Sequence, residues 1–240
     1  MGYPCQPARY FDCAPRRTGG PPDGLNLGLM TSRIPTLRDG YWSVVLVRAL
    51  PAALLALVIT FTADHSPRLG LTAFGLFGVS TGLIVGLSAL RTPGRSPESS
   101  LITAQGAVTV AAGAAALAVA LISPSAEVGS LLVVVAVWAA ASGILELYAG
   151  VRARGSHPAA RDWMFVGAIT VALAVLLFAV PAGFEQQYAG PDRVARTLNA
   201  SVVAVGALGA YGAIVAVFLV IAALSLKWAP TAQPQDGTAS

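Results

Sequence analysis

Six long apolar segments constrain the fold of this chain more than any other feature. Each has about the 20 residues that an α-helix needs to cross a hydrocarbon core roughly 30 Å thick. Together they contain two charged residues, Arg48 and Glu146. The sequence therefore predicts an all-α integral membrane protein with six transmembrane helices, at 41–63, 69–90, 101–122, 131–151, 163–180 and 201–226.

The composition supports this fold class and excludes others. Of the 240 residues, 55% are hydrophobic and 11% are charged, whereas about 25% are charged in a soluble domain. The net charge is +4, and the longest run of basic residues is Arg16-Arg17. Nucleic acid is therefore not an expected partner. Cys5 and Cys13 stand without a second pair. The pattern predicts no metal site, disulfide framework or cofactor.

The basic residues between the predicted spans indicate an orientation. With the N-terminus inside, eleven of the 15 Lys and Arg residues lie on the cytoplasmic side and three lie outside, as the positive-inside rule requires. We therefore expect a multi-pass protein of the cell (inner or plasma) membrane with both termini in the cytoplasm. The lipid bilayer is its expected partner.

Both ends of the chain are predicted to be disordered. Residues 1–40 are rich in Pro, Gly and Arg and lack the apolar region and cleavage site of a secretory signal. A translation start at Met30 is an open alternative. Residues 229–240 form a polar tail, which leaves 41–228 as the predicted membrane domain.

Regularly spaced prolines indicate an internal repeat. Pro67, Pro124 and Pro181 are separated by 57 residues each, and each falls just beyond an odd-numbered predicted helix, where a proline ends a helix without disturbing its interior. In the even-numbered helices, 81–84 align with 142–145. The sequence predicts three tandem helical hairpins arranged as parallel repeats.

Several of these features resemble one family. The segment 138–147, the glycines Gly106 and Gly113 and the proline-terminated hairpins resemble the HdeD-type small membrane proteins, also called the domain-of-unknown-function 308 family. The similarity is strongest over 101–181 and fainter over 41–91. The resemblance implies a six-helix inner-membrane protein and a role in acid or envelope stress.

Arg48 and Glu146 are the first candidate functional residues, because a charged side chain in a membrane span is costly and therefore a functional hypothesis. Both lie roughly 10 Å from the predicted cytoplasmic boundary at 1.5 Å per residue, so they are expected to meet as an ion pair or to form a proton site. Where the repeats align with Glu146, the other units carry Val85 and Val215. An ion pair that merely stabilises the bundle is the alternative interpretation.

Further polar and aromatic residues are candidates for the lining of a small cavity near this pair. Trp138 precedes Glu146 by eight residues, which places both on nearly the same face of a helix. Gln105, Tyr148 and Tyr211 complete the candidate lining. Simple packing is the alternative role for these side chains.

Glycines four residues apart mark one face of the second predicted helix. Gly78, Gly82 and Gly86 form two overlapping GxxxG patterns, and Gly75 lies close to them. Such a face allows helix backbones to approach closely. We expect it to pack within the bundle, with a homo-oligomer contact as the alternative.

The segment 183–199 is the most polar predicted external connection. Asp192 follows Pro191, and an Asp at this position favours a helix N-terminus. An interfacial helix with Val194 and Leu198 on its apolar edge is the expectation, and a ligand or partner surface is the alternative.

No catalytic motif is present in the sequence. His65 and His157 are predicted on opposite sides of the membrane, and no zinc-protease, phosphate-loop or nucleophile-elbow pattern occurs. A non-enzymatic membrane protein is therefore expected. A pathway for protons or a small solute through Arg48 and Glu146 is the alternative, and a lipid-modifying enzyme is the least supported class.

Overall fold

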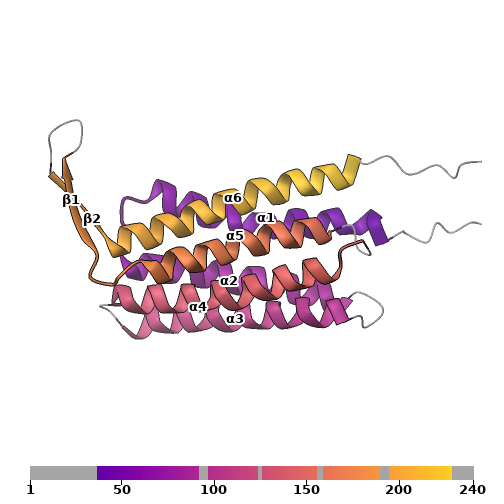
Figure 1. The fold of residues 1–240 in the computed structure, drawn as a ribbon, viewed down its shortest axis with the longest axis horizontal. Coiled ribbons are helices and arrows are strands. Elements are labelled where there is room, and N and C mark those ends of the chain that lie inside the picture. The colour runs from indigo at the N-terminus through magenta and orange to yellow at the C-terminus, as the bar shows by residue number, and fades with distance from the viewer. Residues whose placement is uncertain (1–36, 92–96, 124–125, 156–158, 190–194, 229–240) are drawn as a thin grey trace, which may run out of the picture. The chain divides into compact units, whose positions relative to one another are not determined.

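The structure is a computed structural model that describes residues 37–91, 97–123, 126–155, 159–189 and 195–228. These residues form six helices and two strands (Figure 1): α1 (Leu37–Phe61), α2 (Pro67–Arg91), α3 (Pro97–Ile122), α4 (Val128–Arg152), α5 (Ala160–Ala179), β1 (Glu185–Ala189), β2 (Ala195–Asn199) and α6 (Ala200–Trp228). All six helices are long and apolar enough to cross a membrane. The predicted class, an all-α membrane protein with six spans, is confirmed, with a small β-hairpin in addition.

The helix ends lie within four residues of the predicted boundaries. At α2, Pro67 occupies the first helical position, where its missing N–H costs nothing, and the Ser66 hydroxyl accepts a hydrogen bond from the Leu69 N–H at 3.3 Å. α1 begins at Leu37, within the segment predicted as a disordered leader. The rest of that leader, including Met30, and the tail 229–240 lie outside the described residues.

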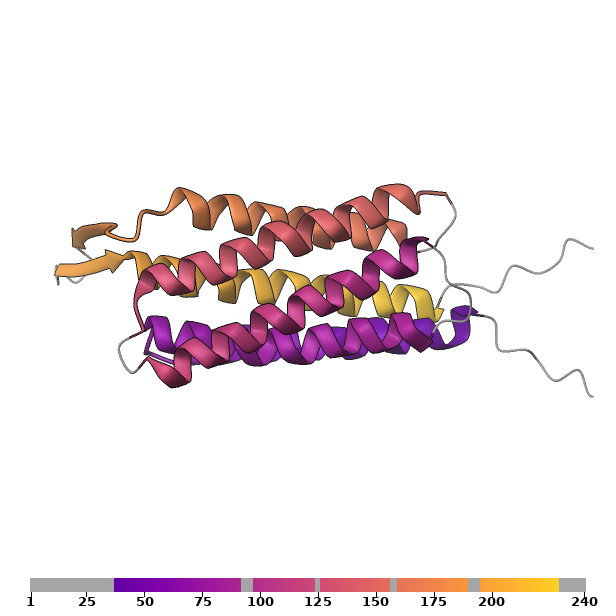
Figure 2. The ribbon, with the colours of Figure 1, turned by 90° about the horizontal axis from the view of Figure 1, so that it is seen from below.

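The helices pack most closely in three pairs, α2 with α3, α4 with α5, and α1 with α6. Figure 2 shows the ribbons running along one another in alternating directions. The consecutive pairs α1/α2, α3/α4 and α5/α6 contact each other less extensively. The grouping into three tandem hairpins therefore stays a prediction, and the closest packing runs between the proposed units.

Each close pair contains a point where two backbones meet at a glycine. A Cβ added to Gly82 in α2 would lie 2.7 Å from the Gly106 carbonyl oxygen in α3. One added to Gly167 in α5 would lie 2.5 Å from the Leu147 nitrogen in α4. In α6, a Cβ at Gly212 would lie 2.9 Å from the carbonyl oxygen of Ala52 in α1. The approach of each pair therefore depends on the missing side chain.

The predicted interfacial helix in 183–199 is wrong. Glu185–Ala189 and Ala195–Asn199 pair as antiparallel strands, with Glu185 opposite Asn199, and they project from the bundle where α5 ends and α6 begins (Figure 1). The cap of α6 is Asn199, whose side-chain oxygen accepts a bond from the Val202 N–H at 2.9 Å. Leu198 lies in β2, and Asp192 and Val194 lie outside the described residues. The physical reason is that Gly190-Pro191-Asp192 is a turn-forming sequence between two short strand-forming runs.

Candidate functional site

The two charged residues of the apolar spans meet in the structure. Arg48 in α1 donates a hydrogen bond from Nη2 to Oε1 of Glu146 in α4, at 2.6 Å. The Glu146 side chain is 3% exposed and the Arg48 side chain 15% exposed. This ion pair is therefore held inside the protein, where a buried charge requires a partner.

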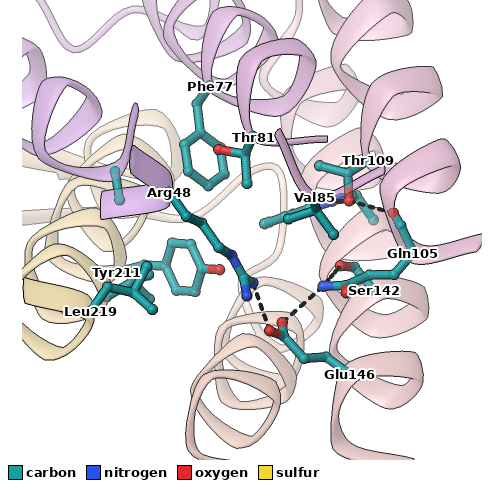
Figure 3. A pocket seen from close by; sticks show the side chains of 13 residues that line it. Arg48, Phe77, Thr81, Val85, Gln105, Thr109, Ser142, Glu146, Tyr211 and Leu219 are labelled. Atoms are coloured by element: carbon teal, nitrogen blue, oxygen red, sulfur yellow. Dashed lines mark hydrogen bonds and ion pairs between the residues drawn. The ribbon is translucent and has the colours of Figure 1, made fainter. Parts of the chain in front are cut away.

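Gln105 in α3 completes the bonding of Glu146. Its Nε2 donates to Glu146 Oε2 at 2.8 Å and lies 3.4 Å from Ser142 Oγ, one turn before Glu146 in α4. Each carboxylate oxygen thus accepts a hydrogen bond from a different helix. We call Arg48, Gln105, Ser142 and Glu146 the central polar network (Figure 3).

The central polar network connects the three close helix pairs. Arg48 belongs to α1 of the α1/α6 pair, Gln105 to α3 of the α2/α3 pair, and Glu146 to α4 of the α4/α5 pair. The pairs themselves are held by apolar packing and glycine contacts. The carboxylate of Glu146 is thus a point at which one side chain from each pair is bonded.

Four aromatic side chains pack beside this network, namely Phe74, Phe77, Trp138 and Tyr211. We call them the aromatic cluster. Trp138 lies at the centre, with ring centroids 4.9 Å from Phe74, 5.9 Å from Phe77 and 6.0 Å from Tyr211. Its ring N–H donates to Thr109 Oγ1 at 3.2 Å. The cluster fills the core next to the ion pair with large, interlocked rings.

The structure places three of the four candidate lining residues around one space. Gln105, Trp138 and Tyr211 line it together with Arg48 and Glu146. The part of this space open to a water-sized sphere is about 10 Å³, and one water needs about 10 to 15 Å³ on that measure. The space has no room for a larger solute.

Tyr148 does not line this space, and its prediction is wrong. The residue is 52% exposed, and its hydroxyl lies 3.4 Å from the Arg152 Nη1 donor on the outer surface of α4. The reason is helical geometry, because two residues beyond Glu146 the side chain points about 200° away.

Sequence reasoning missed several polar residues of the site. Thr81 and Thr109 are buried and line the same space. Thr170 is buried beside it, with its Oγ1 3.1 Å from the Tyr211 hydroxyl. Asp162 in the first turn of α5 lies within electrostatic range of Arg48. Thr109 could have been predicted from its spacing, because it follows Gln105 by four residues and therefore lies on the same face of the helix.

The glycine face of α2 packs within the chain. Gly75, Gly78 and Gly82 are buried against α3, and a Cβ on Gly106 would lie 2.9 Å from the Gly86 Cα. Gly75, Gly78 and Gly82 thus pack against α3, whereas a Cβ added to Gly86 would meet no atom within 4 Å. This face is occupied by α3, so a homo-oligomer requires a different surface.

A second, open hollow of about 680 Å³ borders the β-hairpin. It is lined by the α1–α2 link and the segments that flank the hairpin, and its charged members are Asp64 and Glu185. Both Asp64 oxygens accept hydrogen bonds from Ser66, at 2.8 and 2.9 Å. The alternative interpretation of 183–199 as a ligand or partner surface stays a prediction.

Within the described ranges, no group of three or more His, Cys, Asp or Glu side chains is arranged to hold a metal ion. His65 lies in the link between α1 and α2, and His157, Cys5 and Cys13 fall outside those ranges.

No protein-family model, curated protein or solved structure matches this chain.

Proposed function

We propose that the chain is a non-enzymatic protein of the cell (inner or plasma) membrane, with both termini in the cytoplasm, whose role in acid or envelope stress depends on Glu146. The observation that carries this proposal is the central polar network, in which Arg48 and Gln105 bond the two oxygens of one buried carboxylate. The HdeD-like resemblance, with its role in acid or envelope stress, belongs to the same proposal.

The charge of Glu146 holds the central polar network together. The carboxylate attracts the Arg48 guanidinium and accepts the amide hydrogen bond of Gln105. Loss of this charge removes the carboxylate that bonds Arg48, whose side chain is 15% exposed. Breaking a buried ion pair costs about 3 to 5 kcal/mol. Loss of the pair therefore loosens the contacts among all three helix pairs at once.

A pathway for protons or a small solute is the alternative. It is favoured by the buried carboxylate of Glu146, because ionisable groups inside membrane spans often mark such pathways. The space around the carboxylate, about 10 Å³, is too small for a solute larger than water. The aromatic cluster fills the adjacent core. The geometry therefore supports a closed site better than a continuous pathway.

Acid survival of cells that carry the wild type or variants of Glu146 tests the proposal. Glu146→Gln keeps the size and amide hydrogen bonding but removes the charge, so we expect loss of the acid phenotype. Glu146→Asp keeps the charge and should retain part of it. Glu185→Gln, at an exposed carboxylate in β1, is the matched control. Identical survival and membrane levels in all forms would contradict the proposal.

Proton flux in proteoliposomes separates the proposal from the alternative. We expect the wild type and Glu146→Gln to show the same background flux after a pH step. A wild-type flux that Glu146→Gln abolishes would favour the proton pathway.

A further inference from the structure

The hydroxyl of Thr81 is buried without a protein partner. The residue is 7% exposed, and its Oγ1 makes no hydrogen bond with any residue that the structure describes. Other helix hydroxyls bond the carbonyl one turn before them, as Thr109 bonds Gln105 and Thr170 bonds Val166. Thr81 does not bond the corresponding Phe77 carbonyl, so its bonding capacity is not used by its own helix.

The even-numbered helices carry a hydroxyl at equivalent places. Thr81, Ser142 and Tyr211 each precede a glycine at which two backbones meet, and all three line the same central space. Ser142 lies 3.4 Å from the donor Nε2 of Gln105, and the Tyr211 hydroxyl pairs with Thr170 at 3.1 Å. Thr81 stands out because the side chains described around it supply no such partner.

The space that Thr81 lines has about the size of one water molecule. Its volume is about 10 Å³, and a cavity needs about 10 to 15 Å³ to hold one water. Arg48, Gln105 and Tyr211 bring further polar groups to its wall (Figure 3). An ordered buried water commonly makes about three hydrogen bonds to polar groups that otherwise lack partners.

We propose that this space binds a single water molecule, anchored by the Thr81 hydroxyl. The water satisfies a group whose burial without a partner is unfavourable. Because water both donates and accepts hydrogen bonds, it can bond Thr81 and a second polar group that lines the space. This site does not depend on the proposed response to acid.

The test compares three variants of the purified full chain in lipid nanodiscs. Thr81→Val is nearly isosteric and removes the hydroxyl, whereas Thr81→Ser keeps it. Thr72→Val is the matched control, because Thr72 lies on the same helix, is exposed and bonds the Arg68 carbonyl. The two readouts are the infrared O–H stretch of buried water, identified by its shift in H₂¹⁸O, and the melting temperature.

With a bound water, the wild type and Thr81→Ser both show the isotope-sensitive band, and Thr81→Val loses it. Loss of one hydrogen bond should lower the melting temperature of Thr81→Val by about 2 to 4 °C. In a dry space the same substitution removes an unfavourable buried hydroxyl, so its melting temperature should rise. Absence of the band in the wild type, or its persistence in Thr81→Val, would overturn the proposal even if one variant folds poorly.

Discussion

The glycine contacts of the close helix pairs and the central polar network hold the same helices by opposite means. At Gly106 or Gly167, two backbones approach because a side chain is missing, and each contact involves two neighbouring helices. At Glu146, side chains from three helices converge because a charge requires partners. The pairs are therefore specified by shape, whereas their assembly into one bundle uses the charge of Glu146 in addition to the aromatic cluster, which joins α2, α4 and α6.

Removing one member of the ion pair should have the largest effect. Glu146→Leu removes the carboxylate that bonds the Arg48 guanidinium, at an expected cost of about 3 to 5 kcal/mol in the free energy of unfolding. Arg48→Met combined with Glu146→Leu should recover much of that loss, because both charges of the pair are then absent. Reversible unfolding in mixed detergent micelles measures both. If the double variant loses as much unfolding free energy as Arg48→Met and Glu146→Leu lose together, charge pairing does not explain the contact.

Filling a glycine contact should have the next largest effect. In Gly167→Ala the new methyl group would lie 2.5 Å from the Leu147 nitrogen and 3.0 Å from the Gly143 carbonyl oxygen, so α4 and α5 must separate. Overpacking of this kind costs about 1 to 3 kcal/mol. The same unfolding measurement applies. A free energy of unfolding equal to that of the wild type would show that the contact between α4 and α5 does not depend on the missing side chain.

Removing the Tyr211 hydroxyl should have a smaller effect. Tyr211→Phe keeps the ring in the aromatic cluster but deletes the hydrogen bond with Thr170, worth about 0.5 to 1.5 kcal/mol. Tyr148→Phe is the matched control, because Tyr148 is 52% exposed and should show no change. Thermal melting followed by tryptophan fluorescence compares the two. Equal melting temperatures for both variants would assign the Tyr211 hydroxyl no role in stability.

The smallest effect is expected at a glycine outside these contacts. A Cβ on Gly206 in α6 meets no atom within 4 Å in the described structure. Gly206→Ala should therefore raise the free energy of unfolding by up to about 1 kcal/mol through helix propensity. Thermal unfolding followed by circular dichroism shows whether the substitution stabilises or destabilises the protein. Destabilisation comparable to that of Gly167→Ala would show that glycine content, and not the specific backbone contact, matters.

The sequence predicted the spans and the ion pair because both follow from local rules. Apolar length defined the six helices, and counting residues from the helix ends placed Arg48 and Glu146 at the same depth. Helical periodicity likewise placed Trp138 on the face of Glu146. The prediction failed for Tyr148, where the same periodicity directs the side chain outward.

Other features depend on distant residues and could not be predicted from one segment. The close contact of α2 with α3 requires Gly82 and Gly106 to meet at the same height, which neither helix specifies alone. The bond from Gln105 to Glu146 spans 41 positions. The β-hairpin was missed for a different reason, because the turn sequence 190–192 was interpreted as a helix start.

The pairing of α1 with α6 has a consequence for biogenesis. Lys227, near the end of α6, lies 5.0 Å from the ring centroid of Trp42 near the start of α1, and α1 contacts α6 more extensively than any other described helix. Arg48 likewise finds Glu146 only 98 positions later. During synthesis from the N-terminus, α1 therefore precedes both the carboxylate that its arginine bonds and the helix that it contacts most. Its main packing face is covered only after α6 has been synthesised.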